Sequence, residues 1–312
     1  MTQDEPFIKL GDKVYHLTKN DDAPTARLED HHFTEPEPIK CKWCGSDDIK
    51  KYGIREGVQE YLCLTCNRKF TNKDNPYGKR SSVEDIGTSI SSYYDGLSFA
   101  DIARHLTESG KPVNESTVYR WVISYAQKAV KMMESFKPKV GEIWVADETV
   151  IAFERNNHWL WDVIDSDTRF LLASYLSDNR GTRQAQRLME LACKRAGGLV
   201  PRKVVTDKLA AYLDGIELTF GADTEHIQTS PFTHETYNNV IERFQGTIKD
   251  RTKVLRGFKT YDTAIIILDG FLVHYNFFKP HLSLQGKTPA EMAGIKLPFK
   301  TWTEFVREDK YV

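Results

Sequence analysis

The segment Ile143-Trp-Val-Ala-Asp147 is the most informative part of this chain, because a short apolar run ends there in an acidic residue. Lys203-Val-Val-Thr-Asp207 has the same form later in the chain. Short apolar runs of this kind predict buried strands. A helix expected from about residue 238 to 250 carries a third acid, Glu242. Two strand ends and a facing helix can converge at one edge of a sheet, which would bring the three carboxylates together.

The segments around these strands predict a domain that mixes strands and helices over residues 140–295. Two further strands and two helices are expected at residues 158–164, 170–175, 182–196 and 261–278. The turn-forming residues Asp165-Ser-Asp167 between the two strands indicate a hairpin. Residues 296–312 are expected to form a C-terminal tail. The fold class that follows for this domain is α/β.

Asp147, Asp207 and Glu242 are the candidate catalytic residues, and they are also the candidate ligands of Mg²⁺ or Mn²⁺. Hard cations prefer oxygen ligands, and carboxylates supply them. Two such ions can clamp the attacking and leaving oxygens of a phosphodiester. Taken alone, each of these acids has an ordinary explanation as a surface or strand-end carboxylate.

Several other acidic residues compete for the same role, namely Glu148, Asp162, Asp165, Asp167 and Asp178. Position on the strand favours Asp147 over Glu148, because Glu148 begins the opposite face. The predicted hairpin turn accounts for Asp165 and Asp167.

The helix that carries Glu242 lies in a basic stretch, since residues 238–259 contain six basic residues against two acidic ones. Such a strip suits contact with a phosphate backbone. Asn239 and Lys249 share roughly the face of Glu242, so Lys249 could meet a phosphate near the cations. The candidate DNA-binding residues here are Asn239, Arg243, Lys249, Arg251, Lys253 and Arg256. The alternative is an ordinary solvated helix face.

Four cysteines near the N-terminus, Cys41, Cys44, Cys63 and Cys66, predict a zinc site. Two Cys-x2-Cys pairs are separated by 18 residues, a spacing typical of tetrahedral Zn²⁺ ligation by thiolates. Gly45 permits the tight turn after the second cysteine, and residues 49–54 and 58–62 are expected to pair as a hairpin. The prediction is a zinc ribbon over residues 37–72, too small to fold without its metal. A purely structural zinc site without DNA contact is the alternative.

Residues 80–136 are predicted to be helical and to form a helix-turn-helix DNA-binding domain. Ser82 and Ser98 are suitable N-caps for the first two helices. The third helix would place its N-terminal residues against base edges in the major groove. Its candidate DNA-binding residues are Asn114, Ser116, Thr117 and Arg120. The alternative is a small helical bundle that only links domains.

Composition limits the remaining choices. The 312 residues carry a net charge of −1, which hides an acidic N-terminal part with nine acidic against five basic residues in residues 1–40. Residues 1–36 are expected to form a flexible acidic arm. No run of about 18 apolar residues predicts a membrane span, and no apolar signal core follows the first residues. Paired cysteines favour metal binding in a reducing compartment over disulfides, and Cys193 is expected to be a core residue.

Taken together, these motifs resemble DDE-class transposases of prokaryotic insertion sequences and, more distantly, retroviral integrases. The likeness covers roughly residues 80–295, and the 34 residues between Asp207 and Glu242 agree with the short second interval of that family. The matching segments are Trp144-Val-Ala-Asp147-Glu-Thr, Val205-Thr-Asp207, Asn238-Asn-Val-Ile-Glu242-Arg with Lys249, Arg256-Gly-Phe-Lys259, Tyr275-Asn-Phe-Phe-Lys-Pro-His281 and Lys287-Thr-Pro-Ala-Glu291.

The resemblance implies a ribonuclease-H-like catalytic domain with a mixed sheet, in which Asp147, Asp207 and Glu242 hold Mg²⁺ or Mn²⁺. It implies nicking at transposon ends, followed by attack of the freed 3′-hydroxyl on target DNA. The partners would be double-stranded DNA, as terminal inverted repeats and as target, and further copies of the chain in a homodimer or higher assembly. The expected location is the prokaryotic cytoplasm, at the nucleoid.

Two other functions stay open at this stage. A plain nuclease on the same catalytic fold would cut DNA without joining it. A transposase-derived regulator would bind DNA through the ribbon and the helix-turn-helix without catalysis. A zinc-stabilised scaffold for protein partners would explain neither the three acids nor the basic strip.

Overall fold

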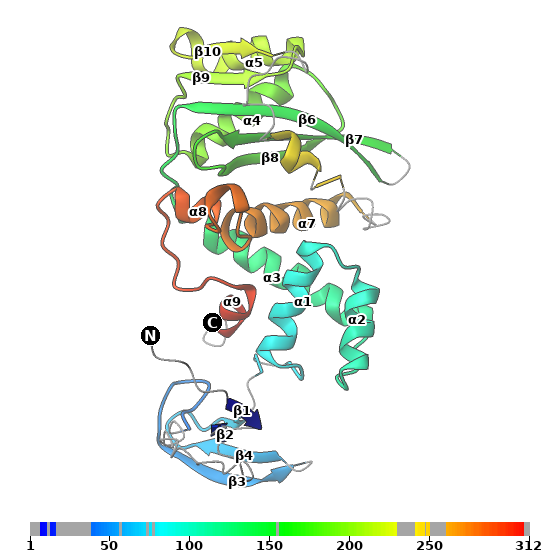
Figure 1. The fold of residues 1–312 in the computed structure, drawn as a ribbon, viewed down its shortest axis with the longest axis vertical. Coiled ribbons are helices and arrows are strands. Elements are labelled where there is room, and N and C mark those ends of the chain that lie inside the picture. The colour runs from blue at the N-terminus through cyan, green and yellow to red at the C-terminus, as the bar shows by residue number, and fades with distance from the viewer. Residues whose placement is uncertain are drawn as a thin grey trace, which may run out of the picture. The chain divides into compact units, whose positions relative to one another are not determined.

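The computed structural model describes ten stretches of the chain: residues 7–10, 13–16, 39–55, 58–72, 75–76, 79–153, 156–229, 241–246, 248–249 and 260–308. These residues belong to two compact units, Met1–Asn72 and Lys73–Val312. Figure 1 shows the elements of both units. No helix in the described part of the chain is both long enough and apolar enough to cross a membrane.

The first unit contains a three-stranded antiparallel sheet around the cysteines. Its strands are β3 (Ile49–Arg55), β4 (Val58–Cys63) and β5 (Lys69–Thr71), in that order. The predicted hairpin is therefore confirmed, and β5 adds a third strand. Cys41, Cys63 and Phe70 form a small buried cluster, which is too little core to hold a fold without a further constraint.

A second, two-stranded element lies within residues 1–36. β1 (Phe7–Leu10) pairs antiparallel with β2 (Lys13–His16). The sequence predicted a flexible acidic arm for this stretch, and the two strands were not predicted. The other residues of the arm lie outside the described residues.

Three helices begin the second unit: α1 (Val83–Asp95), α2 (Phe99–Glu108) and α3 (Glu115–Met133). The predicted caps are confirmed, since the side chains of Ser82 and Ser98 each accept a backbone N–H at 3.1 Å. The Asn114 side chain caps α3 in the same way. Such caps satisfy the unpaired N–H groups of a helix N-terminus and stabilise it by about 1 kcal/mol each.

A five-stranded mixed sheet forms the centre of this unit, in the order β10-β9-β6-β7-β8. Its strands are β6 (Ile143–Phe153), β7 (Asn156–Asp165), β8 (Leu171–Ser177), β9 (Lys203–Thr206) and β10 (Glu225–Gln228). β6, β7 and β8 pair antiparallel, whereas β9 and β10 run parallel to β6. The predicted α/β class with a mixed sheet is confirmed. β6 lies in the middle of the sheet, and near its start it pairs with β9 on one side and β7 on the other.

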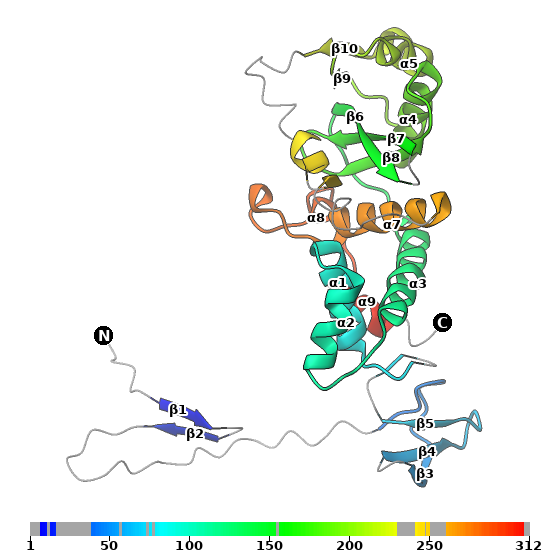
Figure 2. The same ribbon diagram turned by 90° about the vertical axis from the view of Figure 1, so that its right-hand side faces the viewer.

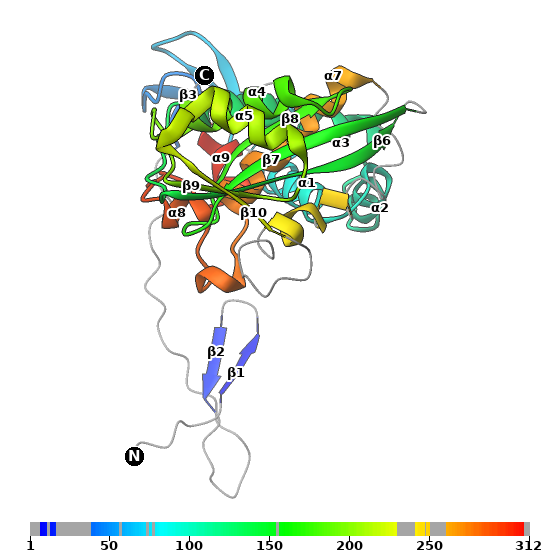
Figure 3. The same cartoon turned by 90° about the horizontal axis from the view of Figure 1, so that it is seen from above.

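Helices cover the sheet and connect it to α1–α3. α4 (Thr182–Arg195) and α5 (Ala210–Phe220) lie along one side of the strands, as Figures 2 and 3 show. α7 (Tyr261–Val273) bonds to β8, where the Tyr261 hydroxyl donates to the Leu176 carbonyl at 2.9 Å. The last elements are η2 (His274–Phe278), η3 (Leu282–Leu284), α8 (Pro289–Met292) and α9 (Trp302–Glu308).

α7, from the C-terminal part of this unit, packs tightly against α3, from its N-terminal part. A Cβ atom at Gly270 of α7 would lie 2.8 Å from the Ala126 side chain of α3, so only glycine permits this approach. α9 falls within the predicted tail of residues 296–312, and its Trp302 is buried. The indole N–H of Trp302 donates to His274 Nδ1 at 3.1 Å. α1–α3, the sheet and α9 therefore belong to one compact unit.

Candidate active site and zinc site

Asp147 and Asp207 come together because of where β9 ends. β9 pairs with β6 only over Ile143–Val145, and Asp207 is the first residue after β9. Asp147 lies two residues past Val145, which is the last residue of β6 that pairs with β9. Since β6 and β9 are parallel, both acids lie at the same edge of the sheet. This is the convergence that the two strand patterns predict.

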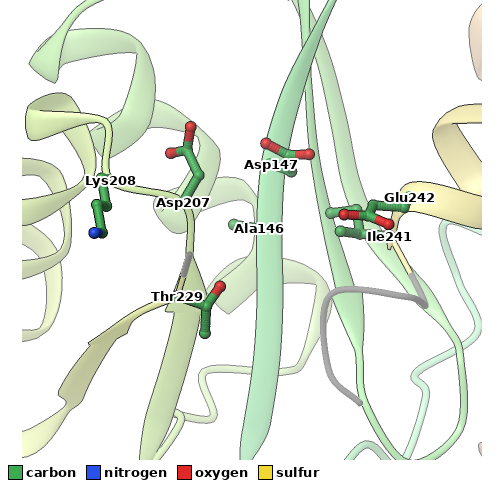
Figure 4. Close-up of a pocket in the computed structure, with 7 residues that line it drawn as sticks. All are labelled: Ala146, Asp147, Asp207, Lys208, Thr229, Ile241 and Glu242. Carbon is green, nitrogen blue, oxygen red and sulfur yellow. The ribbon is translucent and has the colours of Figure 1, made fainter. Parts of the chain in front are cut away.

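A cavity of about 340 Å³ lies at this edge of the sheet. Its lining residues are Ala146, Asp147, Asp207, Lys208, Thr229, Ile241 and Glu242. Figure 4 shows Asp147 on its strand between Asp207 on one side and Glu242 on the other. Glu242 comes from the helical residues 241–246. The structure thus places all three predicted acids around one cavity.

The charges in this site act on one another. Burial, followed by the charges of Glu148, Asp207 and Glu242, raises the pKa of Asp147 to about 7. Like charges held close together disfavour ionisation, and a nearby cation reverses that effect. The donor set consists of carboxylate oxygens, which suits Mg²⁺ or Mn²⁺. The crowding of acids around Asp147 is the observation that fits a divalent cation here.

The strand pattern predicted the face on which Glu148 lies but not how close its carboxylate comes to Asp147 and Asp207. Its strand partner confirms that it faces away from Asp147, since Asp147 pairs with Asp162 and Glu148 with Trp161. Even so, Asp147, Glu148 and Asp207 each offer a carboxylate oxygen, and these oxygens all lie within 4.8 Å of one another. The signal in the sequence was an acid placed directly beside Asp147 inside an apolar strand.

Three of the other competing acids, Asp162, Asp165 and Asp178, have local partners. Asp165 accepts the backbone N–H and the hydroxyl of Thr168, so the predicted turn explains it. Asp178 lies 2.6 Å from His158 Nδ1. Asp162 is fully buried and accepts the Ser174 hydroxyl at 2.7 Å. Burial, with a contribution from the Asp147 charge, raises the pKa of Asp162 to about 8.

The predicted DNA-contacting residues of the third helix lie at the N-terminus of α3. Asn114 caps the helix through its side-chain oxygen, which accepts from the Ser116 backbone N–H at 2.9 Å. The Arg120 side chain donates to the Ser116 carbonyl and to the Thr117 hydroxyl. Asn114, Ser116 and Arg120 are exposed, as surface contact requires.

A second hollow borders these residues. It has a volume of about 900 Å³, and Asn114, Thr117 and Arg120 line it. The other lining residues are Lys79, Arg80, Ser81, Ser82, Asp85, Lys111, Pro112, Val113 and Trp121. Four of the twelve lining residues are basic, which gives this surface the charge that a phosphate backbone favours.

The basic strip around Glu242 is described only in part. Arg243 and Lys249 are exposed. The other candidate residues of the strip, Asn239, Arg251, Lys253 and Arg256, lie outside the described residues. Lys208 is a basic residue that the sequence analysis did not select, and it lines the acidic cavity next to Asp207.

The four predicted zinc ligands form one cluster. All four sulfur atoms lie within 4.8 Å of one another, and the Cys41–Cys66 and Cys44–Cys63 sulfur atoms are 3.6 Å apart. Tetrahedral ligation with Zn–S bonds of about 2.3 Å gives sulfur–sulfur distances of about 3.8 Å. Gly45 has a positive φ of 72°, as the predicted knuckle turn requires. The cluster therefore fits a zinc ion.

Comparison with known proteins places the acidic cavity in a recognised domain. Residues 141–281 match the family described as a DDE domain. The transposase for the insertion sequence-like element IS431mec of Staphylococcus aureus strain Mu50 is 28% identical over 222 residues, which are 69% of this chain and 95% of the relative. The Staphylococcus aureus transposase for the insertion sequence element IS257 in transposon Tn4003 matches with the same identity and coverage.

Among solved structures, the catalytic core domain of HTLV-2 integrase in complex with magnesium matches at 17% identity and a TM-score of 0.40, over 51% of this chain and 98% of that chain. Asp147, Asp207 and Glu242 all fall within the residues that match the DDE domain.

Proposed function

With the resemblance to DDE-class transposases of insertion sequences confirmed by the DDE domain at residues 141–281, we propose that this protein nicks transposon ends and joins the freed 3′-hydroxyl ends to target DNA. The observation that carries the proposal is the placement of Asp147, Asp207 and Glu242 around one cavity. The fold would then be ribonuclease-H-like, which the mixed sheet supports.

The three acids would hold Mg²⁺ or Mn²⁺. When bound, these cations stabilise the negative charge that develops on the attacking and leaving oxygens of a phosphodiester. Asp147 is partly buried on a central strand, and the exposed Glu242 would complete the site from the side of Asp147 opposite Asp207. Lys208 would contact a DNA phosphate at the edge of the cavity.

DNA binding would use surfaces outside the cavity. The exposed α3 N-terminus with Asn114, Ser116 and Arg120 would approach base edges in the manner of a helix-turn-helix. Arg243 and Lys249, with the basic residues beyond them, would contact the backbone. The cysteine cluster would hold Zn²⁺ and stabilise the ribbon as a further DNA-binding element. A homodimer or larger assembly in the bacterial cytoplasm would pair the two transposon ends.

The test is a strand-transfer assay with purified full-length protein, Mg²⁺ or Mn²⁺, DNA carrying the sequence that flanks the gene, and a plasmid target. Joined products that disappear in Glu242→Gln, a change that nearly conserves volume, would support the proposal. DNA binding should persist in that variant, since only a metal-binding charge is removed.

Two other outcomes would redirect the proposal. Cutting without joining would favour a plain nuclease. Binding without cutting or joining would favour a transposase-derived regulator. Retained cleavage by Glu242→Gln would exclude Glu242 as an essential ligand.

A further inference from the structure

Glu148 lies on the strand face opposite Asp147, yet its carboxylate comes within 4.8 Å of those of Asp147 and Asp207. Its strand partner is Trp161, whose ring contacts the Tyr212 ring of α5. Glu148 therefore points toward the side of the sheet that α5 covers. β9 pairs with β6 only as far as Val145, so at Glu148 the β6 backbone is not bonded to β9. A side chain from this face can therefore reach the edge where Asp147 and Asp207 lie.

The Glu148 carboxylate is almost completely buried and only half satisfied. The side chain is 1% exposed. Its Oε1 accepts the Arg180 Nε–H at 2.8 Å and a second, shorter bond from Arg180 Nη2. Its Oε2 is buried and has no hydrogen-bond partner among the residues that the structure describes. A buried ionised group normally has all its bonding positions filled, and an open one points to a bound water or ion.

Arg180 is itself held in one orientation. Its guanidinium lies over the Trp159 ring, with Cζ 4.5 Å from the ring centroid. A planar guanidinium stacked on an aromatic ring is a rigid donor, so it also fixes the carboxylate that it binds. The pair leaves Oε2 of Glu148 as the oxygen available to another group.

Tyr212 of α5 is a second buried polar residue on the side of the sheet that carries Glu148. Tyr212 is fully buried, and its hydroxyl has no hydrogen-bond partner within the described part of the chain. Its ring packs against Trp161, the strand partner of Glu148, with 5.5 Å between the ring centroids. Glu148 and Tyr212 therefore lie on the same covered side of the sheet.

We propose that Glu148 is a fourth carboxylate of the divalent-cation site, in which it presents Oε2 to a cation shared with Asp147 and Asp207. Arg180 is the positioning residue that holds Glu148 in this orientation. The inference rests on the proposed function, because it adds a ligand to the same metal site.

A purely structural Glu148–Arg180 ion pair explains less. Such a pair would tie β6 to the loop before α4 through Oε1 alone. It gives no reason for three carboxylate oxygens to lie within 4.8 Å of one another, where like charges oppose each other. A shared cation turns that repulsion into ligation and uses the open oxygen of Glu148.

The experiment measures Mn²⁺ binding to the zinc-loaded full-length protein by calorimetric titration, so its readout does not depend on catalysis. Glu148→Gln keeps the shape and removes the charge, and it should weaken Mn²⁺ binding by about tenfold or more. Glu148→Asp, which restores the carboxylate on a shorter stem, should recover part of this loss. Arg180→Gln should weaken binding by about tenfold, since it acts only through Glu148.

Glu217→Gln is the matched control, because it removes an exposed glutamate from α5 in the same unit. It should bind Mn²⁺ as the unaltered protein does. Circular dichroism would verify that each variant is folded, and Glu148→Asp serves as the test if Glu148→Gln does not fold.

Failure of this inference differs from failure of the proposed function. If Asp147→Asn abolishes Mn²⁺ binding but neither Glu148 variant weakens it, the metal site stands and the role of Glu148 is overturned. If the unaltered protein shows no Mn²⁺ binding that depends on Asp147, the metal site itself is wrong and both proposals fall.

Discussion

The two candidate metal sites differ in how far apart in the chain their ligands lie. The cysteine cluster takes its four sulfur atoms from two short knuckles of one small sheet. The acidic cavity takes its carboxylates from a central strand, the end of a second strand and a helix much further along. A locally built site depends on its metal for folding, whereas a site assembled by tertiary structure depends on the fold for its geometry.

The largest effect is expected when the cysteine cluster loses a ligand. Cys63→Ser should abolish zinc binding, because Cys63 is buried and the ribbon has little other core. Structural zinc contributes about 10–16 kcal/mol to the folding of small domains. Amide hydrogen exchange should show loss of protection in residues 39–72, with protection of the second unit unchanged. Zinc content measured on the same sample gives the second readout.

Cys193→Ser is the matched control for that change, since Cys193 is a partly buried thiol on α4 outside the cluster. It should keep its zinc. A Cys63→Ser protein with full zinc content and protected ribbon amides would show that the cysteine cluster is not the constraint that holds this sheet.

Without its cation, the acidic site should lower the free energy of unfolding as the pH rises. The pKa of Asp147 is raised to about 7 by burial and neighbouring acids, above the value of an unfolded aspartate. The folded state therefore binds the proton more tightly. Its stabilising contribution is complete below about pH 4 and is lost as the pH rises through about 7. The loss amounts to at most about 4 kcal/mol, at 1.36 kcal/mol for each pKa unit.

Urea denaturation without added Mg²⁺, at several pH values from 4 to 8, measures this effect. Asp147→Asn should flatten the dependence of the unfolding free energy on pH, because asparagine does not ionise. Mn²⁺ should flatten it in the unaltered protein, since the cation replaces the proton as the partner of the carboxylate. Stability that rises with pH over this range would contradict the burial of unpaired acids at this site.

Catalysis should depend on Asp147 without the fold depending on it. Asp147→Asn should lower strand transfer by about 100-fold or more, which corresponds to about 2.7 kcal/mol in the barrier. The melting temperature in the absence of cations should stay equal or rise, because a buried charge is removed. Asp178→Asn is the control, as this exposed acid pairs with His158 outside the cavity. Equal loss in both variants would indicate a general structural effect.

Local sequence was enough to predict the cysteine cluster and the helix caps. The spacing of the four cysteines determines which sulfur atoms can meet, and Ser82 and Ser98 bond to residues only three positions away. The strand patterns that end at Asp147 and Asp207 placed both acids correctly at one edge, because parallel neighbours share their ends.

Glu148 could not be placed in the same way. Alternation along β6 assigns it to the face opposite Asp147, and the structure agrees. Its approach to Asp147 and Asp207 arises because β9 stops pairing at Val145 and because Arg180 comes from a loop after β8. Both are tertiary features with no periodic signal. The hairpin of β1 and β2 and the burial of Trp302 were missed for a related reason, since short charged or terminal segments show weak periodicity.

The smallest expected effect separates the surroundings of the two sites. Arg68 lies over the Trp43 ring beside the cysteine cluster, with 5.2 Å between Cζ and the ring centroid, and Arg180 lies over Trp159 beside the acids in a similar arrangement. Arg68→Gln should leave zinc content unchanged, because the knuckles orient the sulfur atoms through their own backbone. Arg180→Gln should weaken Mn²⁺ binding, because Arg180 orients a carboxylate that the backbone alone does not fix.

This pair of variants compares the same chemical change at two stacked arginines, with metal content and Mn²⁺ titration as the measurements. Zinc loss in Arg68→Gln would show that the ribbon also relies on its surroundings. Unchanged Mn²⁺ binding in Arg180→Gln would show that the acidic site does not. The distinction between a locally built site and one assembled by tertiary contacts requires that the neighbouring arginine affect metal binding at the acidic site alone. Either result would therefore contradict it.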